Sequence, residues 1–450
     1  MSIVVIVIAV ILLLATFVYP VMSLMFFLNT ALFKGWMMLQ FSFFRAVDFT
    51  VLCAILVLVA MAYHLLRSGV RMRDIISVPL IIYVALAGVL LLGVTYTSAP
   101  NYGLQKSTRF ATLTLIAFLA PIAFAHRFRE FKLMIWILII AGIVCAIGTV
   151  VDPHGAVIKA LPESRAGFLE ADPLGTAARI AMAAAILFVF LIMSGTPFLL
   201  RVASFALIVL TMVSIIITGS RGPFLGLAFT WLATIFICHR AISKAWVPVV
   251  VAATLVVMVV AFAQLPRMAT ERIGAVWTSG YEAKQAAFTR TEMFVWAARH
   301  SVDRPLLGHG TGAFAVDRGG PDERYYPHNI ILEMLYEQGL LGLVVVSLFL
   351  WLIFRRWRQA ARFVHSYDLG KQTFLAVHIA GLVFLFVFTQ ALKSGDVNDN
   401  RIMFFCAGLV IAAHNLARRA AEEGLLETDL TAEGQEDLTE LELQNSGVLY

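Results

Sequence analysis

Residues 133–151 read LMIWILIIAGIVCAIGTVV, nineteen residues without a charged side chain. As an α-helix this run measures about 28 Å, close to the roughly 30 Å hydrocarbon core of a bilayer. Comparable runs recur along nearly the whole chain of 450 residues, of which 60% are hydrophobic and 14% charged. The mean hydropathy is +0.87. Because soluble domains carry about 25% charged residues, the composition excludes a water-soluble fold and predicts an all-α polytopic membrane protein.

The apolar runs and the polar breaks between them predict about twelve transmembrane helices. Residues 21–33, which follow Pro20, are also apolar and predict a half-helix or an interfacial segment. The N-terminus lacks a basic segment and a small-residue cleavage site, so we expect the first span to be retained. The twelve predicted spans lie near residues 3–19, 47–66, 75–96, 109–125, 133–151, 176–194, 198–218, 222–238, 245–263, 329–354, 372–392 and 402–417.

Charge divides the chain into two predicted parts. Residues 420–450 hold nine Asp or Glu and no Lys or Arg, which predicts an acidic cytoplasmic tail that is solvated and partly disordered. Residues 1–419, the predicted membrane domain, carry 34 basic and 28 − 9 = 19 acidic side chains. Such an excess orients helices and meets anionic membrane lipid. No nucleic-acid-binding motif is present, so we expect no nucleic-acid partner.

The basic residues also predict the orientation. With twelve spans and the N-terminus inside, the cytoplasmic segments hold sixteen Lys or Arg and the short outer segments ten. The long loop at 264–328, between spans nine and ten, holds the other eight, but loops of that length contribute little to topology. Both termini are therefore predicted to be cytoplasmic, and the long loop is predicted to form helices on the outer surface.

Several ionisable residues fall at the outer ends of predicted spans. His328 directly precedes the span that begins near 329, and Glu333 and Glu337 lie on one face of it, one to two turns deeper. A carboxylate at that depth costs a few kcal/mol unless it is paired or hydrated, so both should face the protein interior or a water-filled cavity. An isolated histidine at such a position is also typical of a cap or an interfacial side chain.

Four arginines are predicted on the same outer face. Several guanidinium groups that converge from separate segments suit a multiply charged phosphate ligand, although solvated surface charges are the simpler interpretation. No cofactor or metal ion is expected. The segment 396–401 begins like a calcium loop but lacks its glycine and its closing glutamate, and the four cysteines lie singly within apolar runs. The four arginines are Arg221, Arg272, Arg290 and Arg401.

Three motifs resemble the O-antigen ligase and polymerase superfamily. The first is the run Pro305-Leu306-Leu307-Gly308 through Gly312 and Phe314, followed by His328-Asn329 and by LEMLYEQGLLG at 332–342. The turn Gly219-Ser220-Arg221-Gly222 is similar to the Ser-Arg turn of the family. Arg290 with Trp296 is similar to its arginine-containing periplasmic helix. The resemblance is strong over about 215–345, and over the first half it rests on hydropathy and span number.

The resemblance implies a metal-independent glycosyltransferase of the bacterial inner membrane with a fold like the GT-C class. The implied donor is an undecaprenyl-pyrophosphate-linked glycan, and the implied acceptor is lipid A-core for a ligase or another glycan for a polymerase. By motif match, Arg221 and Arg290 would bind pyrophosphate and His328 would act at the acceptor, as a general base. A third family arginine matches Arg272 or Arg267, and we prefer Arg272. Glu333 or Glu337 could orient His328, and Arg401 could support the site.

The sequence keeps other functions open. A polymerase of O-antigen or exopolysaccharide shares the same motifs as a ligase. A transporter or flippase of lipid-linked sugars would line a pathway through the membrane with charged residues, whereas here most spans lack internal charges and the polar residues gather on one face. A non-enzymatic scaffold is a further alternative. Among these functions we expect a ligase with its active site on the periplasmic face.

Overall fold

The computed structural model describes residues 14–16, 18–68, 72–151, 173–218, 220–239, 241–242, 248, 281–394 and 396–446. Over these ranges the protein is a bundle of helices, and the one β-bridge joins Met193 to Ile242. The helices are η1 (Pro20–Met22), α2 (Ser23–Leu28), α3 (Thr30–Gln40), α4 (Phe43–Ala46), α5 (Phe49–Ser68), α6 (Met72–Ile75), α7 (Val78–Gly93), α8 (Pro100–Arg109), η2 (Phe110–Thr114), α9 (Leu115–Phe124), α10 (Phe128–Val151), α11 (Pro173–Ile192), α12 (Phe198–Thr218), α13 (Arg221–Ile237), α16 (Tyr281–His300), α17 (Phe314–Asp317), α18 (Ile330–Ser366), α19 (Gly370–Ala391) and α20 (Arg401–Ser446).

The polytopic membrane architecture is confirmed, and the number of spans is confirmed only in part. Among the described residues, eight helices are long and apolar enough to cross a membrane. The predicted spans at 75–96 and 222–238 are shorter apolar helices, Val78–Gly93 and Gly222–Ile237. The predicted spans at 3–19 and 245–263 lie largely outside the described residues.

The apolar segment after Pro20 is broken. Pro20–Leu28 and Thr30–Leu39 meet at an angle of 69°, and together they give up to nine candidate spans. The side-chain amide of Asn29, at the break, donates to the carbonyl of Met25 at 2.9 Å. A bent pair of this kind is what the sequence predicts as a half-helix, and it contributes to the wall of a cavity described below.

Burial distinguishes the central helices from the peripheral ones. Most of α11 and of the membrane part of α20 (Arg401–Glu423) is buried, whereas most of α5 and α12 is not. α11 packs against α10, α12, α13 and α19, and α20 packs against α9, α18 and α19. The peripheral helices expose leucine, valine and isoleucine, which suits contact with lipid chains.

An aromatic cluster surrounds the point where α8 meets α9. The ring of Tyr83 stacks on Phe110 and Phe118, with centroids 4.8 and 5.1 Å away, and its hydroxyl donates to the carbonyl of Phe110 at 2.7 Å. Phe110 begins η2, a single π-helical turn within the span Pro100–Phe124. Turns of this type recur at functional sites.

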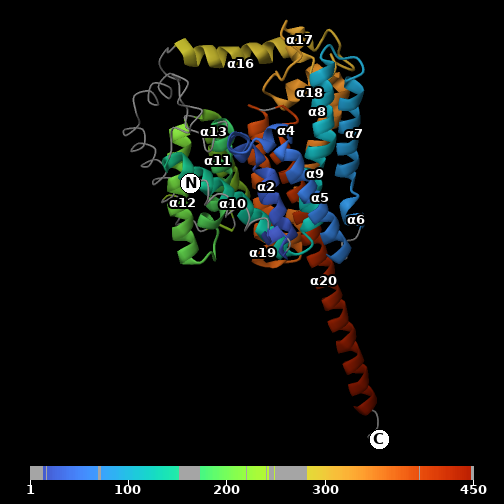
Figure 1. Cartoon of the computed structure of the whole chain (residues 1–450). Coiled ribbons are helices and arrows are strands. Elements are labelled where there is room, and N and C mark those ends of the chain that lie inside the picture. The colour runs from blue at the N-terminus through green and yellow to red at the C-terminus, as the bar shows by residue number, and fades with distance from the viewer. Residues whose placement is uncertain are drawn as a thin grey trace.

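The bundle has two distinct ends (Figure 1). At the loop end, α16 lies across the bundle beside α17 and the start of α18. At the tail end, near α6, α20 leaves the bundle and continues to Ser446. The tail is helical in backbone, whereas the acidic composition of 420–450 predicts a partly disordered extension, and the disorder stays a prediction.

Candidate active site at the loop end

The glycine-rich segment docks into a break in α18. Gly339 has φ +60°, which interrupts the helix, and the carbonyls of Tyr336 and Glu337 accept from the backbone of His309 (3.0 Å) and Gly310 (2.8 Å). A Cβ at Gly339 would lie 2.5 Å from the carbonyl carbon of Leu306, so only glycine allows the two backbones to approach this closely. The glycines therefore serve the local packing of the loop.

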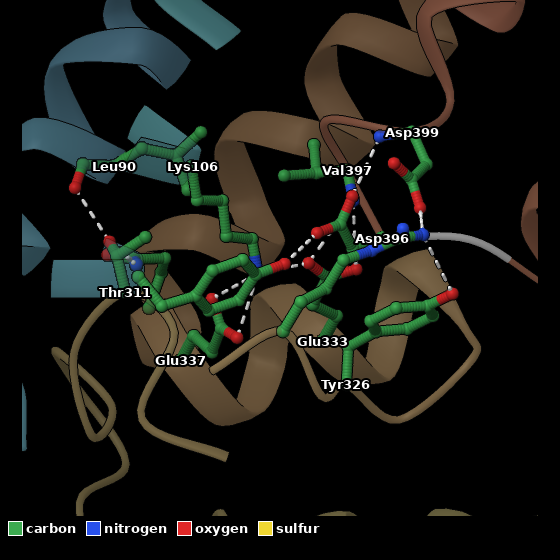
Figure 2. Close-up of polar contacts among 12 residues, drawn as sticks. Leu90, Lys106, Thr311, Tyr326, Glu333, Glu337, Asp396, Val397 and Asp399 are labelled. Carbon is green, nitrogen blue, oxygen red and sulfur yellow. Dashed lines mark hydrogen bonds and ion pairs between the residues drawn. The ribbon is translucent and has the colours of Figure 1, made fainter. Parts of the chain in front are cut away.

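In the turns of α18 before this break, two glutamates form a fully buried charge cluster with a lysine (Figure 2). Lys106 of α8 donates to both carboxylate oxygens of Glu337, at 2.9 and 2.8 Å, and also pairs with Glu333. None of the three side chains has measurable exposure. Both glutamates therefore lie in the protein interior, as the sequence predicts. Each is paired with the same cation, from a helix more than two hundred residues away in sequence.

The same cluster extends to the connection between α19 and α20. Glu333 accepts the backbone N–H of Val397 with both carboxylate oxygens, at 3.2 and 3.1 Å. Tyr102, one turn before Lys106, donates its hydroxyl to Asp396. The carboxylate of Asp396 in turn accepts the backbone N–H of Asp399 at 2.7 Å. One buried network therefore joins α8, α18 and the segment that leads into α20.

His328 occupies a turn immediately before α18. Its φ is +58°, an uncommon conformation for a residue other than glycine. Asn329 caps the helix by accepting the backbone N–H groups of Ile331 and Leu332 at 3.0 and 3.1 Å. The Asn329 amide also donates to the carbonyl of Leu392 at 3.1 Å. The cap thus fixes His328 relative to the start of the α19–α20 connection.

The His328 imidazole is held in its neutral form. Its pKa is lowered to about 4, mainly by burial and then by the nearby charges of Arg290 and Arg324. Its Nδ1 is shielded from solvent and makes no hydrogen bond within the described part of the chain. The ring of Tyr326 lies against it, with centroids 4.5 Å apart. A neutral, partly buried imidazole with an available nitrogen can accept a proton.

A cavity of about 380 Å³ lies beside this turn, with Tyr326 and Arg324 in its lining. Two further arginines line it, Arg179 from α11 and Arg401 from the first turn of α20. The rest of the lining includes apolar side chains from the three helices α2, α11 and α19, namely Leu28, Leu174, Met182 and Phe386. The cavity therefore combines guanidinium groups with an apolar wall.

The three arginines differ in their surroundings. Arg179 donates to the carbonyls of Gly175 (3.1 Å) and Leu28 (3.2 Å), which fixes it between α11 and the bent pair. Arg401 stands 5.3 Å from the ring centroid of Phe27, and its Nε finds no hydrogen-bond partner among the described residues. Arg324 pairs with Asp399 and is largely exposed. The charge of Arg401 in particular is available to an anion.

The other predicted site residues have different positions. Arg290 lies on α16 with its side chain exposed, while Met293 and Ala297 of the same helix pack against Phe314 and Tyr336. Arg221 is the first residue of α13, and the carbonyl of Gly222 beside it accepts from Lys393 at 2.6 Å. Arg272 and Arg267 lie outside the described residues.

The structure corrects one part of the predicted constellation and adds to it. Within the described ranges neither Glu333 nor Glu337 forms a hydrogen bond to His328, because Lys106 engages both carboxylates. The prediction that one of them orients the histidine is therefore not supported. Lys106, Arg179 and Arg324 were not singled out from the sequence. Lys106 and Arg179 carry one signal, a basic residue in an outer segment where the orientation rule disfavours it.

Comparison with protein families gives one match. Residues 206–347 match the family model described as O-antigen ligase. This segment is similar to O-antigen ligases. The predicted resemblance to the O-antigen ligase and polymerase superfamily is thereby confirmed. No curated protein sequence matches the chain.

The O-antigen ligase match points to a class of reaction. It supports a membrane enzyme of the O-antigen ligase or polymerase type, and that family implies a lipid-linked glycan and an acceptor as substrates. The matched segment contains the Arg221 turn, α16, the glycine-rich loop, His328 and both glutamates. It leaves out Lys106, Arg179 and Arg401, which lie elsewhere in the chain.

Proposed function

We propose that the protein transfers a glycan from a polyprenyl pyrophosphate to a sugar hydroxyl on the periplasmic face of the bacterial inner membrane, and that the acceptor is lipid A-core. The observation that carries the proposal is the cavity beside His328, which joins guanidinium groups to an apolar wall. A prenyl chain suits the apolar wall, and a pyrophosphate suits the arginines. The sixteen-to-ten distribution of basic residues favours a periplasmic loop end.

In the reaction, the bond between the anomeric carbon and the pyrophosphate oxygen breaks, and a bond from that carbon to the acceptor oxygen forms. Negative charge builds on the leaving pyrophosphate. Arg401 and Arg179 line the cavity and would stabilise this charge, together with Arg221, Arg290 and Arg272 by family resemblance. Several guanidinium groups can neutralise the charge that a divalent ion neutralises in other transferases, so we expect no metal requirement.

His328 would act as the general base. The acceptor hydroxyl attacks as its proton moves to an imidazole nitrogen, and a neutral imidazole is the form able to receive it. A pKa of about 4 keeps His328 neutral across the physiological range. The proton then passes to solvent or to the released pyrophosphate, which regenerates the base.

The test is transfer by purified protein in EDTA. The protein is incubated with undecaprenyl-pyrophosphate glycan, with or without lipid A-core, beside His328→Gln and Arg401→Gln variants. Glycan that appears on the core with the unmodified protein alone supports a metal-independent ligase. Longer lipid-linked chains without core would identify a polymerase instead. If the glycan crosses a vesicle membrane without any transfer, the protein is a flippase and the proposal is wrong.

A further inference from the structure

The connection between α19 and α20, described at 392–394 and 396–400 and here called the hub loop, contacts three parts of the proposed site. Lys393 donates to the carbonyl of Gly222, next to Arg221, at 2.6 Å. The carbonyl of Leu392 accepts from Asn329, next to His328, at 3.1 Å. Asp399 pairs with Arg324. The position of this loop therefore governs how the predicted donor-binding and acceptor-binding turns face each other.

The hub loop also forms one side of the cavity. Ser394, Asn398, Asp399 and Asn400 line the cavity, and Arg401 follows directly at the start of α20. Within the loop, the carbonyl of Asp396 accepts from the backbone (3.1 Å) and the side chain (2.7 Å) of Asn400. A displacement at Asp396 would thus reach Arg401 through a single hydrogen-bonded turn.

The anchor of the hub loop is the buried cluster on α8 and α18. Val397 is fully buried, and its N–H is held by the carboxylate of Glu333. That carboxylate can stay ionised in an enclosed site only beside a cation, and Lys106 is its salt-bridge partner. Tyr102, on the same helix as Lys106, holds Asp396. The anchor thus depends on a charge that lies outside the segment 206–347.

We propose that Lys106 is a positioning residue: by compensating Glu333 and Glu337 it fixes the hub loop, and so sets the affinity of the cavity for the polyprenyl-pyrophosphate donor. This inference rests on the proposed function for the identity of the ligand. The anchoring itself concerns only the described contacts. Among the described residues, Lys106 does not line the cavity, so its effect on the donor passes through Glu333 and Val397.

The anchoring is tested without any substrate. A Val397→Cys substitution reports on the loop, since the four natural cysteines are buried. A water-soluble maleimide should label this cysteine slowly in the otherwise unmodified protein and at least about tenfold faster after Lys106→Met. The triple variant K106M/E333Q/E337Q should restore slow labelling, because a glutamine carbonyl accepts the Val397 N–H and needs no counter-charge.

The effect on the donor is tested by kinetics on the same variants without the added cysteine. Lys106→Met should raise KM for the undecaprenyl-pyrophosphate glycan roughly ten- to hundredfold and leave the acceptor KM unchanged. The triple variant should recover most of this loss. The matched control is Arg418→Met, which removes a partly buried arginine of α20 that pairs with the buried carboxylate of Asp74 at 2.6 Å, at the tail end of the bundle. It should lower thermal stability without changing labelling or donor KM.

Each result decides a separate claim. An unchanged labelling rate after Lys106→Met overturns the anchoring. If Arg418→Met raises the labelling rate and the donor KM equally, the effect of Lys106→Met is general destabilisation, and the anchoring is overturned as well. Faster labelling with an unchanged donor KM overturns the link to the donor. If the unmodified protein transfers no glycan while labelling follows the expected order, the anchoring stands, and the donor role is overturned with the proposed function.

Discussion

The two ends of the bundle use buried charges in different ways. At the tail end, the carboxylate of Asp74 pairs with Arg418 at 2.6 Å and with Arg419 at 3.4 Å, and Asn415 holds the backbone of the same residue. These arginines point at a carboxylate of the protein itself. At the loop end, Arg401 forms no salt bridge with any described residue and lines a cavity instead.

The difference separates a structural charge from a functional one. An arginine that satisfies an internal carboxylate links helices and leaves little of its charge for a ligand. An arginine that stays uncompensated at the edge of a cavity lowers stability unless a ligand provides the anion, and such sites are typical of function. If this comparison is right, substitutions at the loop end abolish activity, and substitutions at the tail end cost stability alone.

The largest expected effect is at His328. His328→Gln should lower the transfer rate by about 100- to 10,000-fold, the range for loss of a general base. His239 is an exposed histidine at the tail end of α13, and His239→Gln serves as the control with an unchanged rate. Transfer by purified protein is measured after the folded state of each variant is verified by size-exclusion chromatography. A normal transfer rate of His328→Gln would show that His328 is not the general base.

The next largest effect is at Arg401. Removing one charge-assisted contact to pyrophosphate costs about 1.5–3 kcal/mol, which corresponds to a roughly 10- to 150-fold loss of kcat/KM. Arg401→Gln should show this loss, and Arg401→Lys should recover part of it because it keeps the charge without the planar fork. Arg358, which is exposed on α18, provides the control Arg358→Gln. Equal losses of kcat/KM for Arg401→Gln and for the control Arg358→Gln would contradict the comparison between the two ends.

Much of the fold follows from local sequence. Uncharged runs such as 133–151 predict spans because a helix in lipid must satisfy its backbone internally, and Phe128–Val151 matches that run. Val78–Gly93 is shorter than its predicted span. The prediction there follows hydropathy through Tyr96, whereas the helix ends where Gly93 meets Thr311, whose side-chain oxygen would lie 2.4 Å from an added Cβ. That contact joins residues far apart in sequence.

The candidate site was predictable only in part for the same reason. The depth of Glu333 and Glu337 in a span predicts that they are paired, but not that Lys106 is the partner, 231 residues from Glu337. Arg401 was named for its position at the outer face, while Arg179 was not, although both line one cavity. Convergence of α11, α20 and the bent pair is a property of helix packing, and local periodicity does not encode it.

The smallest predicted effect is a shift in the pH dependence of kcat/KM. The pKa of His328 is lowered to about 4, mainly by burial and then by Arg290 and Arg324. A base is active when neutral, so kcat/KM should fall only as pH drops through this pKa and should be level above it. Arg324→Gln removes a positive charge near the imidazole, which favours protonation and moves this acid limb to higher pH.

The shift should be modest because burial, the larger cause, stays in place. Profiles from pH 3.5 to 7.5 on reconstituted protein separate this shift from any uniform loss of activity that follows from weaker donor binding. Arg419→Gln at the tail end, where the arginine contacts His126 at 3.0 Å, is the matched removal of an arginine beside a histidine. An identical limb for Arg324→Gln and the unmodified protein would mean that a group other than His328 accepts the proton.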